Sequence, residues 1–255
     1  MSDRSSDAPA PHSVRGLSIV PDTWLATIMN RDVHRVTGVW WEKDQGSTAL
    51  QELRRLTFQS GFAFARIATQ EVRTSHHLEE CGFRIVDTAL TLEAPRLSDV
   101  ETTSFRVRFA TSEDASAVVD IARQSFRYSR FHLDPEIPRV LADEIKARWA
   151  GNFFSRQRGD YMVVAEQDGR VVGFLQLVTA ADHVLMIDLI AVLPDSRGLG
   201  LAAAMIRFAC MACGRPRMVR VGTQSANLPS LSLYHKLGFQ VVASNHIFHH
   251  HGPSR

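Results

Sequence analysis

The hydrophobic and polar positions in the second half of the chain follow regular periods. "FRVRFA" at 105–110 alternates between apolar and polar residues, as a half-buried strand does. The next stretch, 111–126, opens with Thr111 three residues before Asp114, the spacing of a capping box, and its apolar residues then recur at helical spacing. Another run with a helical pattern covers 141–154. The pattern therefore predicts a strand followed by two helices.

Further along, the pattern predicts a hairpin, a buried strand and a helix. Asp168-Gly169 separates two β-rich runs within 161–178, which is a strong hairpin signal. "VLMIDLIAV" at 184–192 has the apolar character of a buried strand, and the helix after it is rich in alanine and ends at Gly214. The last predicted elements are a strand at 218–224, a short helix around Tyr234 and the strand "FQVVA" at 239–243. This order of strands and helices predicts a mixed α/β sheet.

The first half of the chain has a weaker pattern and contains a short motif that resembles one in the second half. "TALQELRRLTFQSGFAFARIAT" at 48–69 predicts a helix and then a strand, and "GVWW" at 38–41 predicts the end of another strand. "LEECGFRIV" at 78–86 resembles "LYHKLGFQVV" at 233–242, and the dipeptide Thr-Gln precedes both. The spacing between this Gln and the Gly differs in the two copies, which indicates divergence or a coincidence of local structure and not a tandem array.

Composition along the chain predicts two blocks and a tail. The segment "EAPRLSDVETTS" at 93–104 is rich in Pro, Ser, Thr and Asp, so it predicts a joint. We therefore expect a flexible tail at 1–16, a smaller N-terminal domain at 17–98 and a larger domain at 103–255.

Overall composition narrows the class of protein. With 255 residues, of which 45% are hydrophobic and 22% charged, the chain is typical of a globular protein. A net charge of +2 gives no electrostatic reason to expect a nucleic-acid partner. No signal peptide and no membrane-spanning run is evident, and three cysteines suit a reducing compartment, so we expect a cytoplasmic protein. Cys210 and Cys213 have C-x-x-C spacing, but they fit small packing residues of a helix better than a redox or metal pair.

The most informative stretch for function is "LPDSRGLGLAAAM" at 193–205. Glycines allow a ligand to approach the backbone closely, and the first N–H groups of a helix are unpaired and suit a phosphate. A dinucleotide fold is disfavoured because the next strand carries no acidic residue for a ribose, and a Walker loop is excluded because G-K-[ST] is absent. A glycine turn that merely joins a strand to a helix is the remaining alternative.

Two motifs together resemble the GNAT superfamily of acetyl-CoA-dependent N-acetyltransferases. "R-x-x-G-x-A" at 197–202 is similar to the phosphate loop of that family, and "N-x6-Y-x3-GF" at 227–239 is similar to its final helix. The resemblance implies an α/β fold, with a GNAT-type mixed central sheet flanked by helices and preceded by a smaller, degenerate GNAT-like half. The first copy has Leu78 where the second has Tyr234, and no glycine turn precedes it. We therefore expect it to be structural, supporting the acceptor cleft or a homodimer interface.

The resemblance also implies a place for the coenzyme. In that family the amides of the loop hold the pyrophosphate, pantetheine lies where two strands separate, here 184–192 and 218–224, and a backbone N–H near Val192 faces the thioester oxygen. The positions that the resemblance assigns to acetyl-CoA are Leu189, Ile190, Ala191, Val192, Arg197, Gly198, Leu199, Gly200, Leu201, Ala202, Ala203, Asn227 and Ser230. Asn227 is equally compatible with a helix N-cap.

The catalytic residues implied by the resemblance need no covalent intermediate, because the acceptor amine attacks the thioester directly. Tyr234 is expected to protonate the departing thiolate, with a core aromatic residue as the alternative. Asp188 lies in an apolar strand, where burial raises the pKa of a carboxyl group, so it is a candidate base for the amine. His183 just upstream is another candidate, and a buried, hydrogen-bonded acid is the alternative account of Asp188.

The acceptor is expected to contact the segment between the first two helices. Arginines and aromatic residues alternate there, and guanidinium groups suit phosphates while aromatic rings suit stacking on a base. The residues expected to bind the acceptor are Arg127, Tyr128, Arg130 and Phe131. An ordinary solvated basic segment is the alternative.

"QSFRYSRFHLD" followed by "ARW" at 147–149 is also similar to bacterial TDP-fucosamine (dTDP-4-amino-4,6-dideoxygalactose) acetyltransferases, which act on a nucleotide-linked amino sugar. The similarity does not extend through "HLDPEIP". The alternatives are a GNAT enzyme that acts on another small amine or a protein amine, and an acyl-CoA-binding sensor without turnover. The run "HHH" at 249–251 fits a polar strand end better than a metal site, and no metal is expected.

Overall fold

The chain forms two compact units. The computed structural model describes residues 12–14, 17–37, 51–55, 61–97 and 105–252. The first unit comprises residues 1–86 and 246–255, and the second comprises residues 87–245. The strand end expected at 38–41 lies outside the described residues.

Two strands contribute residues to both units. They are β5 (Arg84–Pro95) and β11 (Gln240–His251). The second unit therefore begins within a strand, ahead of the joint that composition predicted. The domain limits of 17–98 and 103–255 stay a prediction about which parts of the chain fold independently.

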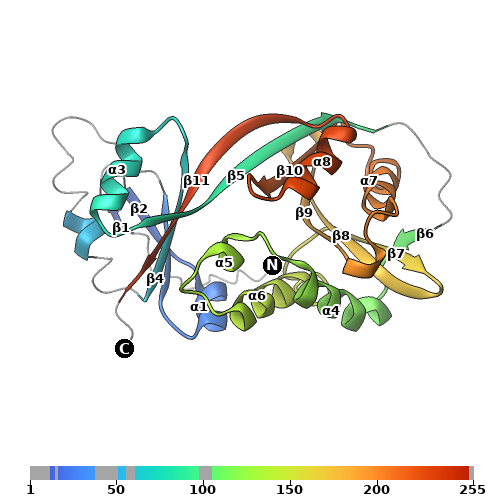
Figure 1. Cartoon of the computed structure of the whole chain (residues 1–255), viewed down its shortest axis with the longest axis horizontal. Helices are drawn as coiled ribbons and strands as arrows, with labels where there is room; N and C mark the ends of the chain where they lie inside the picture. The colour runs from blue at the N-terminus through green and yellow to red at the C-terminus, as the bar shows by residue number, and fades with distance from the viewer. Residues whose placement is uncertain (1–11, 15–16, 38–50, 56–60, 98–104, 253–255) are drawn as a thin grey trace, which may run out of the picture. The chain divides into compact units, whose positions relative to one another are not determined.

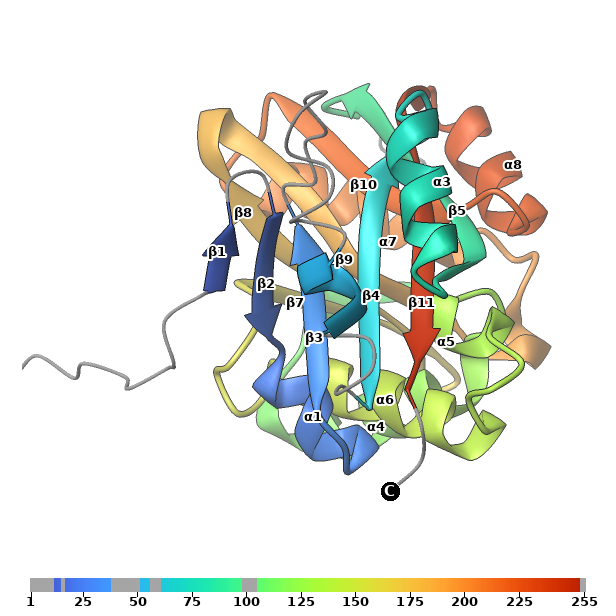
Figure 2. The ribbon, with the colours of Figure 1, turned by 90° about the vertical axis from the view of Figure 1, so that its left-hand side faces the viewer.

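The first unit is a sheet covered by short helices. Its strands run in the order β1-β2-β3-β4-β11-β5, with β3 parallel to β4. Figure 2 shows α3 lying over this sheet. Its other elements are β1 (His12–Val14), β2 (Leu17–Pro21), α1 (Thr23–Met29), β3 (Val33–Thr37), β4 (Phe62–Ala68), α3 (Val72–Glu80) and helical residues at 51–55. Leu78 of α3 is fully buried in its core with Val36, Ala65 and Phe83.

The second unit contains a mixed sheet with strands in the order β11-β5-β10-β9-β8-β7-β6. Figure 1 shows α7 and α8 on one face of it and α4 and α6 on the other. Its strands besides β5 and β11 are β6 (Arg106–Phe109), β7 (Tyr161–Gln167), β8 (Arg170–Ala180), β9 (Val184–Val192) and β10 (Met218–Gln224). Its helices and helical turns are η1 (Ser112–Asp114), α4 (Ala115–Ser125), α5 (Arg130–Leu133), α6 (Arg139–Gly151), η2 (Ala181–His183), η3 (Pro194–Ser196), α7 (Leu201–Ala212) and α8 (Leu228–Lys236).

Local sequence signals explain several of these boundaries. Asp168 and Gly169 join β7 to β8 with φ values of 51° and 74°, as a hairpin turn with two positive φ angles requires. The capping box is formed. The Thr111 N–H donates to Asp114 Oδ2 at 2.7 Å, and the Thr111 side chain accepts from the backbone N–H of Asp114. Cys210 is a buried free thiol of α7, and burial raises its pKa, which agrees with a packing role.

A β-bulge in β9 changes which face of the sheet its side chains meet. In the pairing with β8, Gln176 lies opposite Leu189 and Leu177 lies opposite Ile187, so Asp188 is the extra residue. Ile187 therefore belongs to the core under α7 and α8, whereas Leu189 belongs to the core under α4 and α6. Strict alternation would have placed these two side chains on one face.

Strands β9 and β10 separate directly after the bulge. Their parallel pairing covers only Val184–Ile187 and Met218–Val221, although both strands continue. The separation predicted between 184–192 and 218–224 is therefore present. In the described part of the chain, residues 188–192 therefore have no strand pairing with β10.

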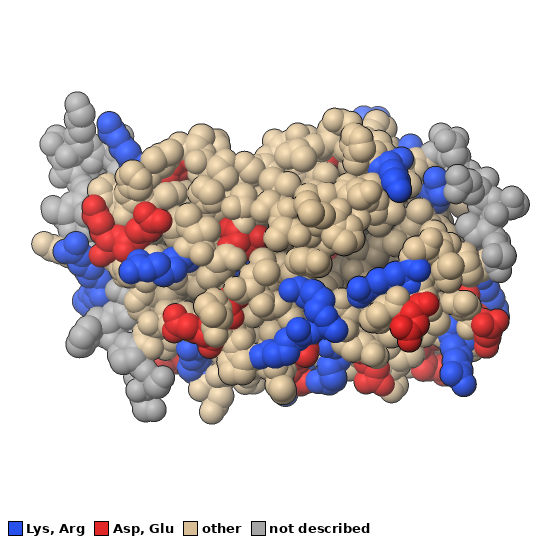
Figure 3. Space-filling model, viewed as in Figure 1, with Lys and Arg blue, Asp and Glu red and all other residues tan. Residues whose placement is uncertain are grey.

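The surface carries charges of both signs. Figure 3 shows basic and acidic side chains interspersed over the face in view. Among the described residues, no helix is long and apolar enough to cross a membrane.

Candidate active site

The turn between β9 and α7 presents its backbone to open space. Gly198 and Gly200 have φ values of 79° and 85°, which a residue with a Cβ rarely adopts. A Cβ added to either would meet no described atom within 4 Å. Gly200 is the N-cap of α7, so the first amides of a helix of 12 residues point outward at its positive end. This arrangement suits a phosphate group.

Arg197 fixes the position of this turn. Its Nε donates to the carbonyl oxygen of Val192 at 3.0 Å, and its Nη2 donates to the carbonyl oxygen of Ser125 at 2.9 Å. The guanidinium thereby joins the end of β9 to the end of α4. In this structure Arg197 orients the backbone of the turn, and its side chain is engaged by carbonyl groups.

Tyr234 on α8 lies in the core of the second unit. Its side chain is 2% exposed and packs against Phe239, with ring centroids 5.4 Å apart. Burial raises the pKa of its phenol, so the hydroxyl stays protonated at neutral pH. A protonated phenol can donate a proton, which is the requirement for the expected role.

Asn227 is the N-cap of α8, as the alternative account proposed. Its Oδ1 accepts from the backbone N–H of Ser230 at 3.3 Å, and its Nδ2 donates to Thr223 Oγ1 at 3.4 Å. These bonds orient the start of the helix that carries Tyr234.

Asp188 projects from the bulge toward α6, where donors occupy both carboxylate oxygens. Its Oδ2 accepts from Trp149 Nε1 at 2.9 Å, from Gln176 Nε2 at 3.0 Å and from Arg158 Nε at 2.7 Å. Its Oδ1 accepts from Arg158 Nη2 at 2.5 Å. These four hydrogen bonds match the alternative account of Asp188, a buried and hydrogen-bonded acid, and its role as a base stays a prediction.

Lys146 is a residue of this region that the sequence analysis missed. It lies on the buried face of α6, four residues after Ala142 and four before Ala150, and only 8% of it is exposed. Burial is the main cause that lowers its pKa to about 8. A lysine on the apolar face of a predicted helix is the signal that could have found it.

The expected acceptor residues differ in their accessibility. Phe131 is 1% exposed, and the Arg130 guanidinium lies 4.2 Å from its ring centroid, so this ring has no free face for a base. Tyr128 is 36% exposed. Arg127 is exposed, and its Nη1 donates to the carbonyl oxygen of Phe126 at 3.1 Å.

A hydrogen-bonded chain orders α5 beside these residues. Ser129 Oγ lies 2.6 Å from His132 Nδ1, and His132 Nε2 lies 3.0 Å from Asp143 Oδ1 on α6. Burial lowers the pKa of His132, and Asp143 opposes this effect. These hydrogen bonds therefore connect the short helix α5 to the longer helix α6.

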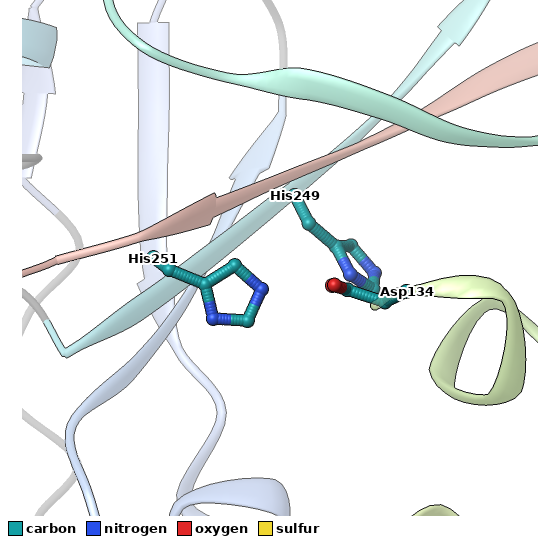
Figure 4. Close-up of side chains that lie close together, drawn as sticks. All are labelled: Asp134, His249 and His251. Atoms are coloured by element: carbon teal, nitrogen blue, oxygen red, sulfur yellow. The ribbon is translucent and has the colours of Figure 1, made fainter. Parts of the chain in front are cut away.

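The histidines at 249–251 are the last residues of β11, which agrees with the strand end expected from the sequence. Figure 4 shows His249 and His251 projecting from the same face of the strand. Their rings contact Phe62, with centroids 4.8 Å and 5.1 Å away, and Arg31 Nη2 lies 3.3 Å from His251 Nδ1. Asp134 in the same figure belongs to the second unit, where its Oδ1 accepts from the backbone N–H of Glu136 at 2.9 Å.

Comparisons with known proteins agree with this geometry. Residues 116–239 match the family model described as the Acetyltransferase (GNAT) family. The chain is 28% identical over 195 residues to the spore coat polysaccharide biosynthesis protein SpsD of Bacillus subtilis (strain 168), covering 75% of this chain and 67% of that protein.

Solved structures share the fold at low sequence identity. A protein of unknown function from Staphylococcus epidermidis has a TM-score of 0.70 and 13% identity, covering 97% of this chain and 95% of that one. A GCN5-related N-acetyltransferase from Kribbella flavida has a TM-score of 0.63 and 17% identity, covering 96% and 91%. A tandem GNAT protein from the clavulanic acid biosynthesis pathway has a TM-score of 0.60 and 15% identity, covering 88% and 76%.

Residues 116–239 thus form a GNAT acetyltransferase domain, and the protein is an N-acetyltransferase. Enzymes of this family use acetyl-CoA and an acceptor amine.

Proposed function

We propose that the protein transfers an acetyl group from acetyl-CoA to the amine of a nucleotide-linked amino sugar. The separation of β9 from β10, next to the open turn of Gly198 and Gly200, is the observation that carries the proposal. The sugar class is supported by the similarity to SpsD, whose name places it in polysaccharide biosynthesis.

The coenzyme would be bound mainly by backbone groups of the second unit. The amides of 198–203 would bind the pyrophosphate at the start of α7. The unpaired edge of 189–192 would bind pantetheine as a neighbouring strand would, with an N–H near Val192 available to the thioester oxygen. The side chain of Arg197 would act by holding the turn, and Asn227 by starting α8.

Tyr234 would act as the general acid. Its raised pKa supports the role, because a coenzyme A thiolate needs a donor that is still protonated at neutral pH. The amine attacks the thioester carbon directly, so no nucleophilic side chain is required.

The diphosphate of the acceptor would meet the arginines before α6. Arg127 is exposed, and Tyr128 beside it has an accessible ring for the base. Arg130 would contribute charge, whereas Phe131 would support it from the core.

The test is release of free thiol from acetyl-CoA with a panel of acceptors. The panel holds dTDP-4-amino-4,6-dideoxygalactose, the same amino sugar without the nucleotide, a polyamine and single amino acids. We expect the nucleotide-linked sugar to have the highest kcat/KM, and Arg127→Ala to raise its KM without changing that of acetyl-CoA. Preference for a simple amine would refute the sugar class, and acetyl-CoA binding without turnover on any amine would indicate a sensor.

A further inference from the structure

Lys146 is a buried amine that the roles proposed above do not use. Its ammonium group lies 4.6 Å from the ring centroid of Trp149 and 4.9 Å from that of Phe126. No carboxylate of the described residues forms an ion pair with it. Burial of a lysine without a carboxylate partner is costly, and such residues are concentrated at functional sites.

The position of Lys146 connects the two parts of the site. Trp149, which contacts its ammonium group, donates to Asp188 at the bulge where β9 and β10 separate. Phe126, its other aromatic contact, directly follows the residue whose carbonyl accepts from Arg197 of the glycine turn. Lys146 therefore lies beside the point where a thioester bound between the strands would react.

Two buried polar atoms around Lys146 have no hydrogen-bond partner in the described part of the chain. They are Gln176 Oε1 and Ser125 Oγ. Gln176 is 0% exposed, and its amide nitrogen donates to Asp188, so the carbonyl oxygen is fixed in place. Proteins rarely leave buried polar atoms unpaired, so these two atoms are available to a water molecule or to a polar group of a ligand.

The charges that face Lys146 come from several elements. Asp188 on β9 raises its pKa, whereas Arg130 on α5 and Arg158 after α6 lower it. His132 on α5 also interacts with it, and Phe126, the C-cap of α4, presents an aromatic ring. These surroundings make the neutral amine accessible near physiological pH.

We propose that Lys146 is the general base that takes a proton from the ammonium group of the acceptor, an inference that rests on the proposed acetyl transfer. The lone pair of the Lys146 amine accepts one proton from the acceptor, and this proton later passes to solvent. The acceptor amine, now neutral, forms a C–N bond with the thioester carbon while the C–S bond breaks. Tyr234 gives its proton to the sulfur and is restored by the second N–H proton. The oxygens of Asp188 accept four hydrogen bonds from Trp149, Arg158 and Gln176, which hold this carboxylate in place.

The test compares Lys146→Arg with Lys146→Met. Arginine keeps the charge but does not deprotonate, whereas methionine fills the volume without charge. We expect kcat to fall about 100-fold in both at pH 7. The deficit should shrink as the pH rises above the pKa of the acceptor, because the amine is then neutral without a base. Acetyl-CoA affinity should stay within a few fold, and Lys236→Met on the exposed end of α8 is the matched control.

The assays use the full chain with dTDP-4-amino-4,6-dideoxygalactose, or with whichever panel amine reacts fastest. A wild-type kcat in Lys146→Arg would overturn the general-base role of Lys146. It would indicate instead that the positive charge at this position binds the acceptor. An equal loss in both variants at every pH from about 6.5 to about 9.5 would also overturn it, since a packing role has no such dependence. A wild-type protein that acetylates no amine would instead refute the proposed function itself.

Discussion

Gly200→Ala tests whether the turn before α7 binds the coenzyme. At a φ of 85° an alanine is strained by roughly 1 to 2 kcal/mol, part of which is offset because alanine restricts the unfolded chain. The added methyl would meet no described atom within 4 Å, so it would cause no steric clash with the described part of the protein. It would instead occupy the space of the pyrophosphate and remove at least one amide-to-phosphate hydrogen bond. That loss is worth about 2 kcal/mol, or about 30-fold in the Kd of acetyl-CoA.

Gly214→Ala is the matched control at the other end of the same helix. Gly214 has a φ of 65° and also meets no atom within 4 Å, so the backbone strain is similar. Both variants should lose about 1 kcal/mol of stability, a Tm decrease of about 2 to 4 °C, by calorimetric unfolding. Only Gly200→Ala should weaken acetyl-CoA binding in titration calorimetry. Equal affinities in the two variants would remove the turn from the coenzyme site.

Two further predictions concern the acid and the capping box. Tyr234→Phe should lower kcat about 100-fold and leave the affinity for acetyl-CoA within a few fold. Leu78→Ala should lower the stability of the protein without this selective loss of kcat. An unchanged kcat in Tyr234→Phe would make Tyr234 a packing residue. Hydrogen bonds from Arg108 and then Thr111 lower the pKa of Asp114 from 3.8 to about 2. Because this pKa is lowered on folding, the stabilisation is present above pH 3.8 and is lost as the pH falls toward about 2, by roughly 1 to 2 kcal/mol. Urea unfolding over this range should show a smaller decline for Asp114→Asn, and an identical decline would contradict the assignment.

The sequence predicts the elements of the second unit because each is marked by a local signal. The hairpin at Asp168-Gly169 and the capping box at Thr111 depend on residues that are close in the chain, and both are formed. The strand at 218–224 has the predicted bounds. Signals of this kind need no knowledge of the partner strands.

The bulge at Asp188 could not be predicted in this way. "LMIDLIAV" has the composition of a buried strand at every position except Asp188, and only the pairing with β8 makes Asp188 the extra residue. The pairing brings Gln176 to its carboxylate, and the packing of α6 and the segment after it brings Trp149 and Arg158. The contacts that bear on the two accounts of Asp188, a base or a buried acid, are therefore not contained in a linear pattern.

The two copies of the "GF" motif give an internal comparison for Tyr234. Leu78 holds the corresponding position of the first unit and is 0% exposed, so an apolar side chain satisfies the packing of this helix. Tyr234 is 2% exposed, and no described residue hydrogen-bonds its hydroxyl. Since leucine meets the packing requirement in the first unit, packing alone does not explain the hydroxyl of Tyr234, and its role as the general acid stays the prediction that Tyr234→Phe tests.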